Sequence, residues 1–329
     1  MSGAITVLKF LDEAHRRGER TVLVAIAEVI FAASRNPGTL MAVSERGAWC
    51  GSLSGGCVEA AVVGEARRVL AQGHAEVLRL GAGSPLIDIR LPCGGGLDLL
   101  IVPDPDADAV ASAIERIDQR QPVTFEIGLD GTLSTSASQP ARRVTWDGQR
   151  LTVRLEPVLR ILAIGQGEEV VALSRLGLAY GAEVLALTPD HAAVGVLTAL
   201  GAEARHLLMP APAPPLPTDP QTAVLLLFHD HDWEQALLIE VLNQPALLIG
   251  AMGSRRTHAL RLEVMRAAGV PEAKLARIEG PIGLIPMTRD PATLALSVLA
   301  QVARAYQAHC DRLCDYNGNR IAGTGLCHP

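Results

Sequence analysis

The spacing of apolar and polar positions predicts a strand-rich first half of the chain. Apolar and β-branched runs separated by glycine, proline and serine predict strands at 21–31, 39–44, 76–80, 86–91 and 97–102. One helix interrupts them at about residues 58–71, where apolar side chains recur at helical spacing. Short strands continue over 123–155, around the turn dipeptides Asp130-Gly131 and Asp147-Gly148.

From Arg160 onward the pattern becomes strand, glycine turn, helix, strand. The segments RILAIGQG, EEVVALSRLGLAYG and AEVLALTPD form a βαβ unit, and the runs VLLLF and ALLIG extend the same parallel sheet. The proline-rich segment 209–220 is expected to be an exposed loop within this domain. We therefore predict an α/β protein with a strand-rich α+β N-terminal domain at 1–156, a Rossmann-like domain at 157–309 and an aperiodic, extended or mobile tail at 310–329.

Composition narrows the class of protein. Hydrophobic residues make up 49% of the 329 residues and charged residues 19%, which fits a globular chain with buried sheets. The net charge of −6, without a long basic run, argues against a nucleic-acid partner. The apolar run 21–31 is too short to span a membrane, and no secretory signal pattern opens the chain, so we expect a cytoplasmic protein. Its six cysteines are too scattered for a disulfide scaffold and are expected to be thiols.

A glycine-flanked cysteine precedes the predicted helix at 58–71. Residues 51–59 are Gly-Ser-Leu-Ser-Gly-Gly-Cys-Val-Glu, which places Cys57 at the helix N-terminus. Free amides and the helix dipole favour an anion there and lower a thiol's pKa toward the metal-binding thiolate. Gly55 and Gly56 would let a large ligand approach the backbone. The alternative is a tight turn with a small buried cysteine.

A second cysteine, Cys93, is followed by Gly94, Gly95 and Gly96 between two predicted strands. The glycines expose backbone amides and leave space around the sulfur. A plain hairpin loop needs no cysteine. Two glycine-flanked cysteines in one domain therefore favour a functional interpretation.

The second domain has a turn in the place of a dinucleotide-binding fingerprint, but the fit is poor. The turn Gly165-Gln166-Gly167 lacks the third glycine. Glu168 and Glu169 would lie in the first helical turn, where they suit the dipole but repel a pyrophosphate. Asp190 stands near the expected position of a ribose-binding acid, which is weak evidence alone.

A second turn in this domain is a candidate anion site. Gly253 and Ser254 lead into a predicted helix, with Ser254 as its N-cap. Apolar residues are aligned along that helix at Leu260, Val264 and Ala268. Arg255 and Arg256 oppose the helix dipole in the first turn, which favours a bound phosphate or pyrophosphate. The alternative is that both arginines extend into water.

Two other groups of residues could bind a metal. The run His229-Asp230-His231-Asp232 cannot face one ion on a regular backbone, so an aspartate helix cap is favoured. The tail residues Cys310, Cys314, Cys327 and His328 match no strong zinc template.

Four motifs, GSLSGGCVE, PCGGGLDLLIVP, GAMGSRR and PIGL, follow one another in this order. With them the chain resembles, over about residues 15–305, the XdhC/CoxI family of xanthine and carbon monoxide dehydrogenase maturation factors. The family pattern GGC-x-E falls on Gly55, Gly56, Cys57 and Glu59, and the pattern CGG falls on Cys93, Gly94 and Gly95. In the second domain, the pattern GSR falls on Gly253, Ser254 and Arg255, and the pattern PIG falls on Pro281, Ile282 and Gly283. Gln166, Glu168 and the segment 190–192 depart from the family pattern, which weakens the case for nucleotide binding.

The resemblance implies a maturation chaperone without turnover of its own. Family members bind molybdenum cofactor, protect it, support its sulfuration by a cysteine desulfurase and insert it into a xanthine dehydrogenase-type enzyme. We expect Mo-molybdopterin as cargo, with Cys57 and Cys93 near the metal and Ser254, Arg255 and Arg256 near the phosphate.

The expected partners are the molybdenum subunit of a xanthine dehydrogenase/aldehyde oxidase-type enzyme, a cysteine desulfurase and a second copy in a homodimer. Two alternatives remain. One is an NAD(P)-dependent oxidoreductase. The other is a redox-active thiol protein, which would require Cα atoms of Cys57 and Cys93 within about 7 Å.

Overall fold

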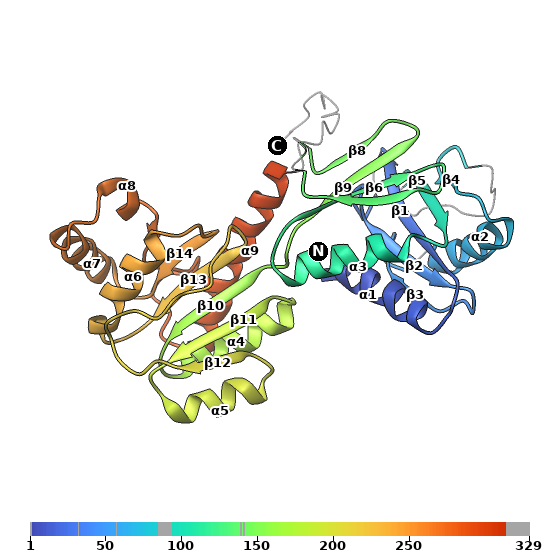
Figure 1. Ribbon diagram of the computed structural model, residues 1–329. Coiled ribbons are helices and arrows are strands. Elements are labelled where there is room, and N and C mark those ends of the chain that lie inside the picture. Colours follow the sequence, from blue (N-terminus) through green and yellow to red (C-terminus); the bar gives the residue numbers. More distant parts are fainter. Residues whose placement is uncertain are drawn as a thin grey trace, which may run out of the picture. The chain divides into compact units, whose positions relative to one another are not determined.

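The structure, a computed structural model, describes residues 2–31, 33–56, 58–84, 94–138, 140 and 142–313. The chain divides into two compact units, one of Met1–Pro157 with the segment from Arg312 and one of Val158–Asp311 (Figure 1). Both contain helices and sheets, as the α/β prediction requires.

The first unit is built around a five-stranded antiparallel sheet. Its strands are β1 (Thr21–Ile30), β2 (Leu40–Ser44), β3 (Trp49–Gly51), β4 (Glu76–Gly81) and β5 (Gly96–Pro103), in the spatial order β3-β2-β1-β5-β4. The predicted strands at 21–31, 39–44, 76–80 and 97–102 are confirmed, whereas the run 86–91 lies outside the described residues. The middle strand β1 is buried on both faces over most of its length, which explains its continuous apolar sequence.

Helices and a second sheet cover the two faces of this sheet. Helix α2 (Glu59–Gln72) packs on one face through Val62, Ala66 and Val69. The other face packs against α1 (Ser2–Arg16), α3 (Ala107–Asp118) and a four-stranded sheet of β6 (Val123–Gly128), β7 (Leu133–Ser136), β8 (Val144–Trp146) and β9 (Arg150–Leu155). Helix α2 confirms the predicted helix, whereas the strand pattern did not predict α1 and α3.

The second unit is a parallel six-stranded sheet, as predicted. Its strands are β10 (Arg160–Gly165), β11 (Glu183–Thr188), β12 (Glu203–His206), β13 (Thr222–Leu227), β14 (Leu248–Ala251) and β15 (Ile278–Glu279), in the order β12-β11-β10-β13-β14-β15. The order in which the chain adds strands reverses between β10 and β13: β11 and β12 lie on one side of β10, and β13, β14 and β15 lie on the other, which is the topological switch of a Rossmann-like fold.

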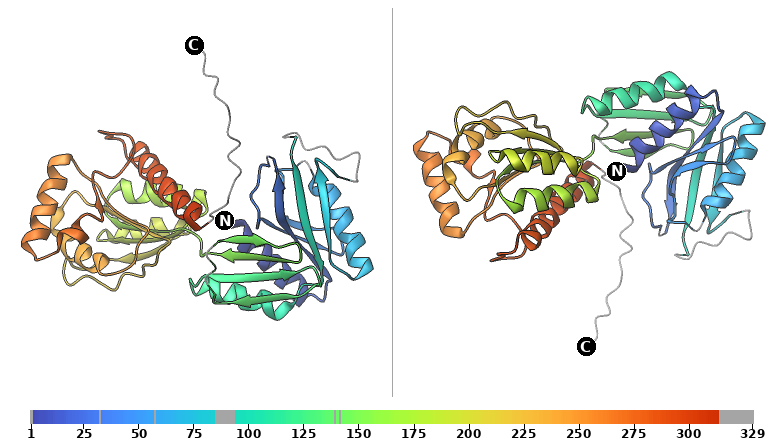
Figure 2. Two further views of the ribbon diagram at one scale, coloured as in Figure 1. Left: turned by 90° about the horizontal axis from the view of Figure 1, so that it is seen from above. Right: turned by 90° about the horizontal axis from the view of Figure 1, so that it is seen from below.

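Helices cover both faces of this parallel sheet (Figure 2). One face packs against α4 (Glu168–Tyr180), α5 (His191–Ala199) and α9 (Pro291–Leu313), and the other against α6 (Glu234–Leu242), α7 (Arg255–Ala267) and α8 (Glu272–Leu275). The short 3-10 helix η1 (His231–Trp233) precedes α6.

Two segments of the second unit bear on the sequence predictions. Residues 209–220 form the predicted loop between β12 and β13, although Leu216 within it is buried. Helix α9 continues through Leu313, so residues 310–313 are helical rather than part of an extended tail. Among the residues that the structure describes, every helix is too short or too polar to cross a membrane.

Candidate functional site

The loop between β3 and α2 is organised by the Glu59 carboxylate. Glu59 is 5% exposed, and its carboxylate accepts hydrogen bonds from the backbone amides of Leu53 at 3.1 Å, Ser54 at 3.1 Å and Val58 at 3.2 Å. The hydroxyls of Ser52 and Ser54 also donate to it, at 2.8 and 3.1 Å. These amides therefore bind the protein's own carboxylate. The prediction that they are free for an external anion is wrong for Leu53, Ser54 and Val58.

The same contacts fix the charge of Glu59. Burial opposes ionisation, but the Ser52 hydroxyl and the amides of Ser54, Glu59 and Gly56 stabilise the charged form and lower the pKa of Glu59 to about 2. The carboxylate is thus ionised at neutral pH and holds the loop in one conformation.

Gly55 and Gly56 present the loop backbone to solvent. Their φ angles are 82° and 114°, a region that favours glycine, and a Cβ added at either residue would meet nothing within 4 Å. A ligand can therefore approach the backbone here. Cys57, the predicted thiolate, lies outside the described residues, directly before the α2 N-cap Val58 in sequence.

The second glycine motif leads into β5. Gly94 is exposed, with a φ angle of 70° and open space at its Cβ position. The Gly95 carbonyl accepts a hydrogen bond from the Ala82 amide at 3.0 Å, which ties the motif to the end of β4. Cys93 lies outside the described residues.

Strand register brings these two motifs to the same edge of the five-stranded sheet. Gly51, where β3 ends, lies opposite Met41 near the start of β2, and Ile30, where β1 ends, lies opposite Gly96 at the start of β5. Because the strands are antiparallel, all these ends point to the same edge of the sheet, with Gly51 level with Val24 of β1, six residues before Ile30. The described residues of the GGC and CGG motifs therefore flank the same edge.

In the second unit, the GSR motif follows β14 at the carboxyl edge of the parallel sheet. The Ser254 hydroxyl accepts a hydrogen bond from the Thr257 amide at 3.1 Å, which confirms Ser254 as the N-cap of α7. Gly253 has a φ angle of 135°. Arg255 and Arg256 are exposed, and neither forms an ion pair or hydrogen bond with another residue in the described part of the chain.

The PIG motif packs directly against this turn. The Ile282 amide donates to the Ala251 carbonyl at 3.0 Å, and the Ile282 side chain would lie 2.6 Å from a Cβ added at Gly250. Gly280 leaves room for the His258 ring of α7, which a Cβ there would strike. Burial, followed by the charge of Arg261, lowers the pKa of His258 and favours the neutral ring. The structure thus brings GSR and PIG together.

A buried ion pair that the sequence analysis missed supports the GSR turn. Arg261 and Glu234 are each 3% exposed at their side chains and form a two-pronged pair at 2.7 and 3.0 Å. Arg261 also donates to the Met252 carbonyl at 2.7 Å. Leu260 and Val264, which align along the helix, are instead 52% and 49% exposed. Because Arg261 interrupts the apolar spacing, hydrophobicity alone could not identify the buried face of α7.

The turn after β10 does not form an open pyrophosphate site. Gly165 lies so close to the Leu227 carbonyl that a side chain would clash. Gly167 is the N-cap of α4, and a Cβ added there would lie 2.8 Å from Glu169 Oε2. The other carboxylate oxygen, Glu169 Oε1, lies 3.2 Å from His229 Nε2. Negative charge therefore occupies the helix N-terminus at the topological switch.

The remaining candidate ligands have structural partners. The Asp190 carboxylate caps α5 by accepting from the Ala192 amide at 2.9 Å. Asp230 accepts from the Asp232 amide at 3.1 Å at the start of η1, whereas α6 has Trp233 as its N-cap and no side-chain cap. Within the described residues, no group of three or more His, Cys, Asp or Glu could hold a metal ion. Cys310 is buried in α9, and Cys314, Cys327 and His328 lie outside the described residues.

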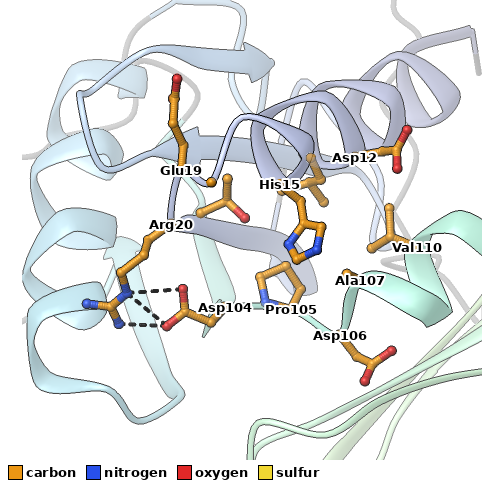
Figure 3. A pocket seen from close by; sticks show the side chains of 12 residues that line it. Asp12, His15, Glu19, Arg20, Asp104, Pro105, Asp106, Ala107 and Val110 are labelled. Atoms are coloured by element: carbon orange, nitrogen blue, oxygen red, sulfur yellow. Dashed lines mark hydrogen bonds and ion pairs between the residues drawn. The ribbon is translucent and has the colours of Figure 1, made fainter.

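A cavity of about 400 Å³ lies at the opposite edge of the five-stranded sheet (Figure 3). It is lined by the end of α1, the start of β1 and the segment between β5 and α3. Within it, Arg20 forms a two-pronged ion pair with Asp104, with a shortest distance of 2.6 Å, beside the exposed His15. Asp106 caps α3 through the Ala109 amide at 2.7 Å. None of the predicted site residues lines this cavity.

Two parts of the chain match known domains. Residues 161–302 match the XdhC Rossmann domain, and residues 14–81 match the XdhC and CoxI family. The first match includes the GSR and PIG turns, and the second includes the GGC loop. All three motifs thus lie in segments that match the two domains.

Similarity to individual proteins extends along nearly the whole chain. The molybdenum cofactor insertion chaperone PaoD of Escherichia coli strain K12 is 34% identical over 301 residues, covering 91% of this chain and 87% of PaoD. The uncharacterized protein YqeB of the same strain is 34% identical over 83 residues, covering 25% of this chain and 15% of YqeB.

A solved structure shares the fold. A Bacillus halodurans protein described as a xanthine dehydrogenase superimposes with a TM-score of 0.72 at 18% identity, covering 92% of this chain and 96% of that chain. At this identity the likeness concerns the fold alone. The long match to PaoD and the two domain matches together establish that this chain belongs to the XdhC/CoxI family.

Proposed function

We propose that this chain binds molybdenum cofactor and inserts it into a xanthine dehydrogenase-type molybdoenzyme. The observation that carries the proposal is the 34% identity to a molybdenum cofactor insertion chaperone over 91% of the chain. Identity of this extent spans both units, so it includes the edges on which the motifs lie.

The described residues fit such a cargo in both units. In the first unit, Gly55, Gly56 and Gly94 leave open space beside the backbone, so a bulky pterin can approach it. In the second unit, Arg255 and Arg256 are exposed cations whose side chains have no partner among the described residues, which suits them to a phosphate.

We assign the residues roles on this basis. Cys57 and Cys93 supply thiolates to the molybdenum, a metal soft enough to accept them. Ser254, Arg255 and Arg256 bind the phosphate. Glu59 holds the GGC loop in shape through its hydrogen bonds rather than touching the cargo.

The proposal extends to the cellular partners. The chain protects the cofactor in the cytoplasm, supports its sulfuration by a cysteine desulfurase and delivers it as a homodimer to the molybdenum subunit of the client. It acts as a chaperone without catalytic turnover.

An NAD(P)-dependent oxidoreductase is less well supported by the geometry. Glu169 and its partner His229 occupy the entrance to the α4 N-terminus, and Asp190 caps α5. A pyrophosphate would have to displace the Glu169 side chain and overcome its charge. A redox-active pair of Cys57 and Cys93 remains an alternative, because both cysteines lie outside the described residues.

Copurification tests the proposal. The chain is expressed without a client in two hosts supplied with molybdate, one with pterin synthesis intact and one with it blocked, and the bound ligand is identified by mass. We expect molybdenum and pterin in equal amounts from the first host and neither from the second. Protein without pterin from the first host would refute cofactor binding.

A further inference from the structure

Phe31 is the most exposed aromatic residue in the described part of the chain. Its side chain is 83% exposed, compared with 51% for Trp49 and 47% for Tyr180. An exposed phenyl ring loses the favourable transfer out of water that a buried one gains. The exposed ring of Phe31 therefore contributes little to the stability of the fold.

The backbone of Phe31 is also strained. Its φ angle is 65°, in the left-handed region that bulky side chains rarely adopt. Strained residues of this kind are concentrated at ligand-binding sites, where the surrounding structure holds them in place. An exposed aromatic ring and a strained backbone thus coincide at Phe31.

Register places Phe31 beside the CGG motif of the first unit. It follows Ile30, the last residue of β1, and Ile30 lies opposite Gly96 at the start of β5. The register of this pairing shifts between Ile26 and Glu28, a bulge of the kind that redirects the end of a strand. The β1 end therefore carries the ring to the edge on which the GGC and CGG loops lie.

We infer that Phe31 is a stacking platform for the pterin ring system of the cargo. The pterin of the cofactor is reduced in its pyrazine part, but its aminopyrimidinone ring is planar and conjugated, and such a ring stacks on an exposed aromatic side chain in the same way as a nucleobase. The open space beside Gly94 leaves the backbone next to this platform accessible to the polar edge of the ring. The inference rests on the proposed function.

Three substitutions separate stacking from general apolar contact. Phe31→Ala removes the ring, Phe31→Leu keeps an apolar side chain without a ring, and Phe31→Tyr keeps the ring. The matched control is Tyr180→Ala, which removes an exposed aromatic at the end of α4, the edge of the parallel sheet opposite the GSR and PIG turns.

The measurement is the rate at which pterin leaves the copurified complex on dilution, followed by the fluorescence of its oxidised derivative. We expect Phe31→Ala and Phe31→Leu to release pterin roughly ten- to a hundredfold faster than the wild type, by analogy with the loss of a base–aromatic stack. Phe31→Tyr and Tyr180→Ala should match the wild type. All four melting temperatures should stay close to that of the wild type, because these side chains are exposed.

Different failures have different signatures. A wild-type chain that carries no pterin would remove the proposed function and this inference with it. If the wild type carries pterin, unchanged release from Phe31→Ala overturns the inference alone. If Phe31→Leu releases pterin at the wild-type rate, an apolar contact is sufficient, and stacking is overturned. Unchanged release combined with lost delivery to a client would make Phe31 a protein contact instead.

Discussion

At the residue scale, Glu59 shows how a sequence motif can identify a residue without revealing its role. The GGC-x-E pattern marks it as a cofactor-binding candidate, but its carboxylate turns inward onto the amides of Leu53, Ser54 and Val58. The direction of that side chain depends on the path of the loop, which spacing along the chain does not specify. The role of Gly55 and Gly56 follows more directly from the sequence, because their backbone adopts positive φ angles that favour glycine.

Replacing Glu59 with Gln should destabilise the first unit in a pH-dependent way. A pKa of about 2 in the folded chain against about 4.3 in the unfolded chain corresponds to about 3 kcal/mol. Because the folded pKa is the lower one, this stabilisation is complete above about pH 5 and is lost as the pH falls through about 4 to 2.

Calorimetric unfolding of the wild type and of Glu59→Gln over this pH range measures the difference. Glu65→Gln is the control, since Glu65 lies on the same helix and forms a more exposed ion pair with Arg68 at 2.8 Å, expected to contribute at most about 1 kcal/mol. A constant gap between wild type and Glu59→Gln from neutral pH to about pH 2 would contradict the assigned ionisation.

Cys57 is the residue on which we expect delivery to depend most. Serine preserves the size of the side chain but stays protonated and is a poor ligand for a soft metal. Cys57→Ser should therefore keep its melting temperature, lose most bound molybdenum and leave a coexpressed client folded but inactive. Molybdenum per client and client activity are the readouts, with Cys93→Ser as the matched variant. Full activity with Cys57→Ser would assign metal binding to Cys93 or to no thiol.

At the element scale, the sequence predicted strands more completely than helices. Four parallel strands of the second unit, β10, β11, β13 and β14, are mostly apolar runs, and β10 is buried over almost its whole length, so their pattern is strong, whereas β12 is polar and exposed. Helices α1 and α3 were missed although their buried residues follow helical spacing, as Leu8 and Leu11 do in α1 and Ala109 and Ala113 do in α3. The contact between the GSR and PIG turns depends on β14 and β15 being neighbours, which motif order alone could not show.

The first turn of α7 should bind phosphate through its two exposed arginines, Arg255 and Arg256. Replacing Arg255 and Arg256 together with Gln removes charge-assisted hydrogen bonds, which should weaken pterin retention by about ten- to a hundredfold. The melting temperature should hardly change, since both side chains are exposed. The dissociation rate of the copurified pterin and the melting temperature are measured on the same sample. Unchanged retention with lowered stability would make the arginines structural.

The Arg261–Glu234 pair should hold α7 to α6 and support the GSR turn. Removing one partner, as in Arg261→Met, takes the guanidinium away from the buried Glu234 carboxylate and should cost up to about 3–5 kcal/mol. Adding Glu234→Leu should recover part of that loss. Hydrogen exchange of peptides from β14 and α7, read by mass spectrometry, reports the local stability. Equal protection in the single variant and the wild type would show that the pair contributes little.

At the scale of the whole molecule, the chain joins two units that offer different groups to a ligand. The first presents glycine-lined backbone at one edge of an antiparallel sheet, and the second presents two exposed arginines at the carboxyl edge of a parallel sheet. The order of the four motifs indicated the family from sequence, and the match to PaoD along 91% of the chain supports that assignment. The placement of Cys57 and Cys93 stays a prediction, because both lie outside the described residues.

The most direct test of the account is delivery of cofactor between purified proteins. The chain, loaded with molybdenum cofactor during expression, is mixed with the cofactor-free form of a xanthine dehydrogenase-type enzyme, and client activity and client-bound molybdenum are followed together. We predict that both rise in proportion as molybdenum leaves the chain, and that chain from the pterin-deficient host has no effect. A loaded chain that keeps its cofactor, or that releases it without activating the client, would contradict the account.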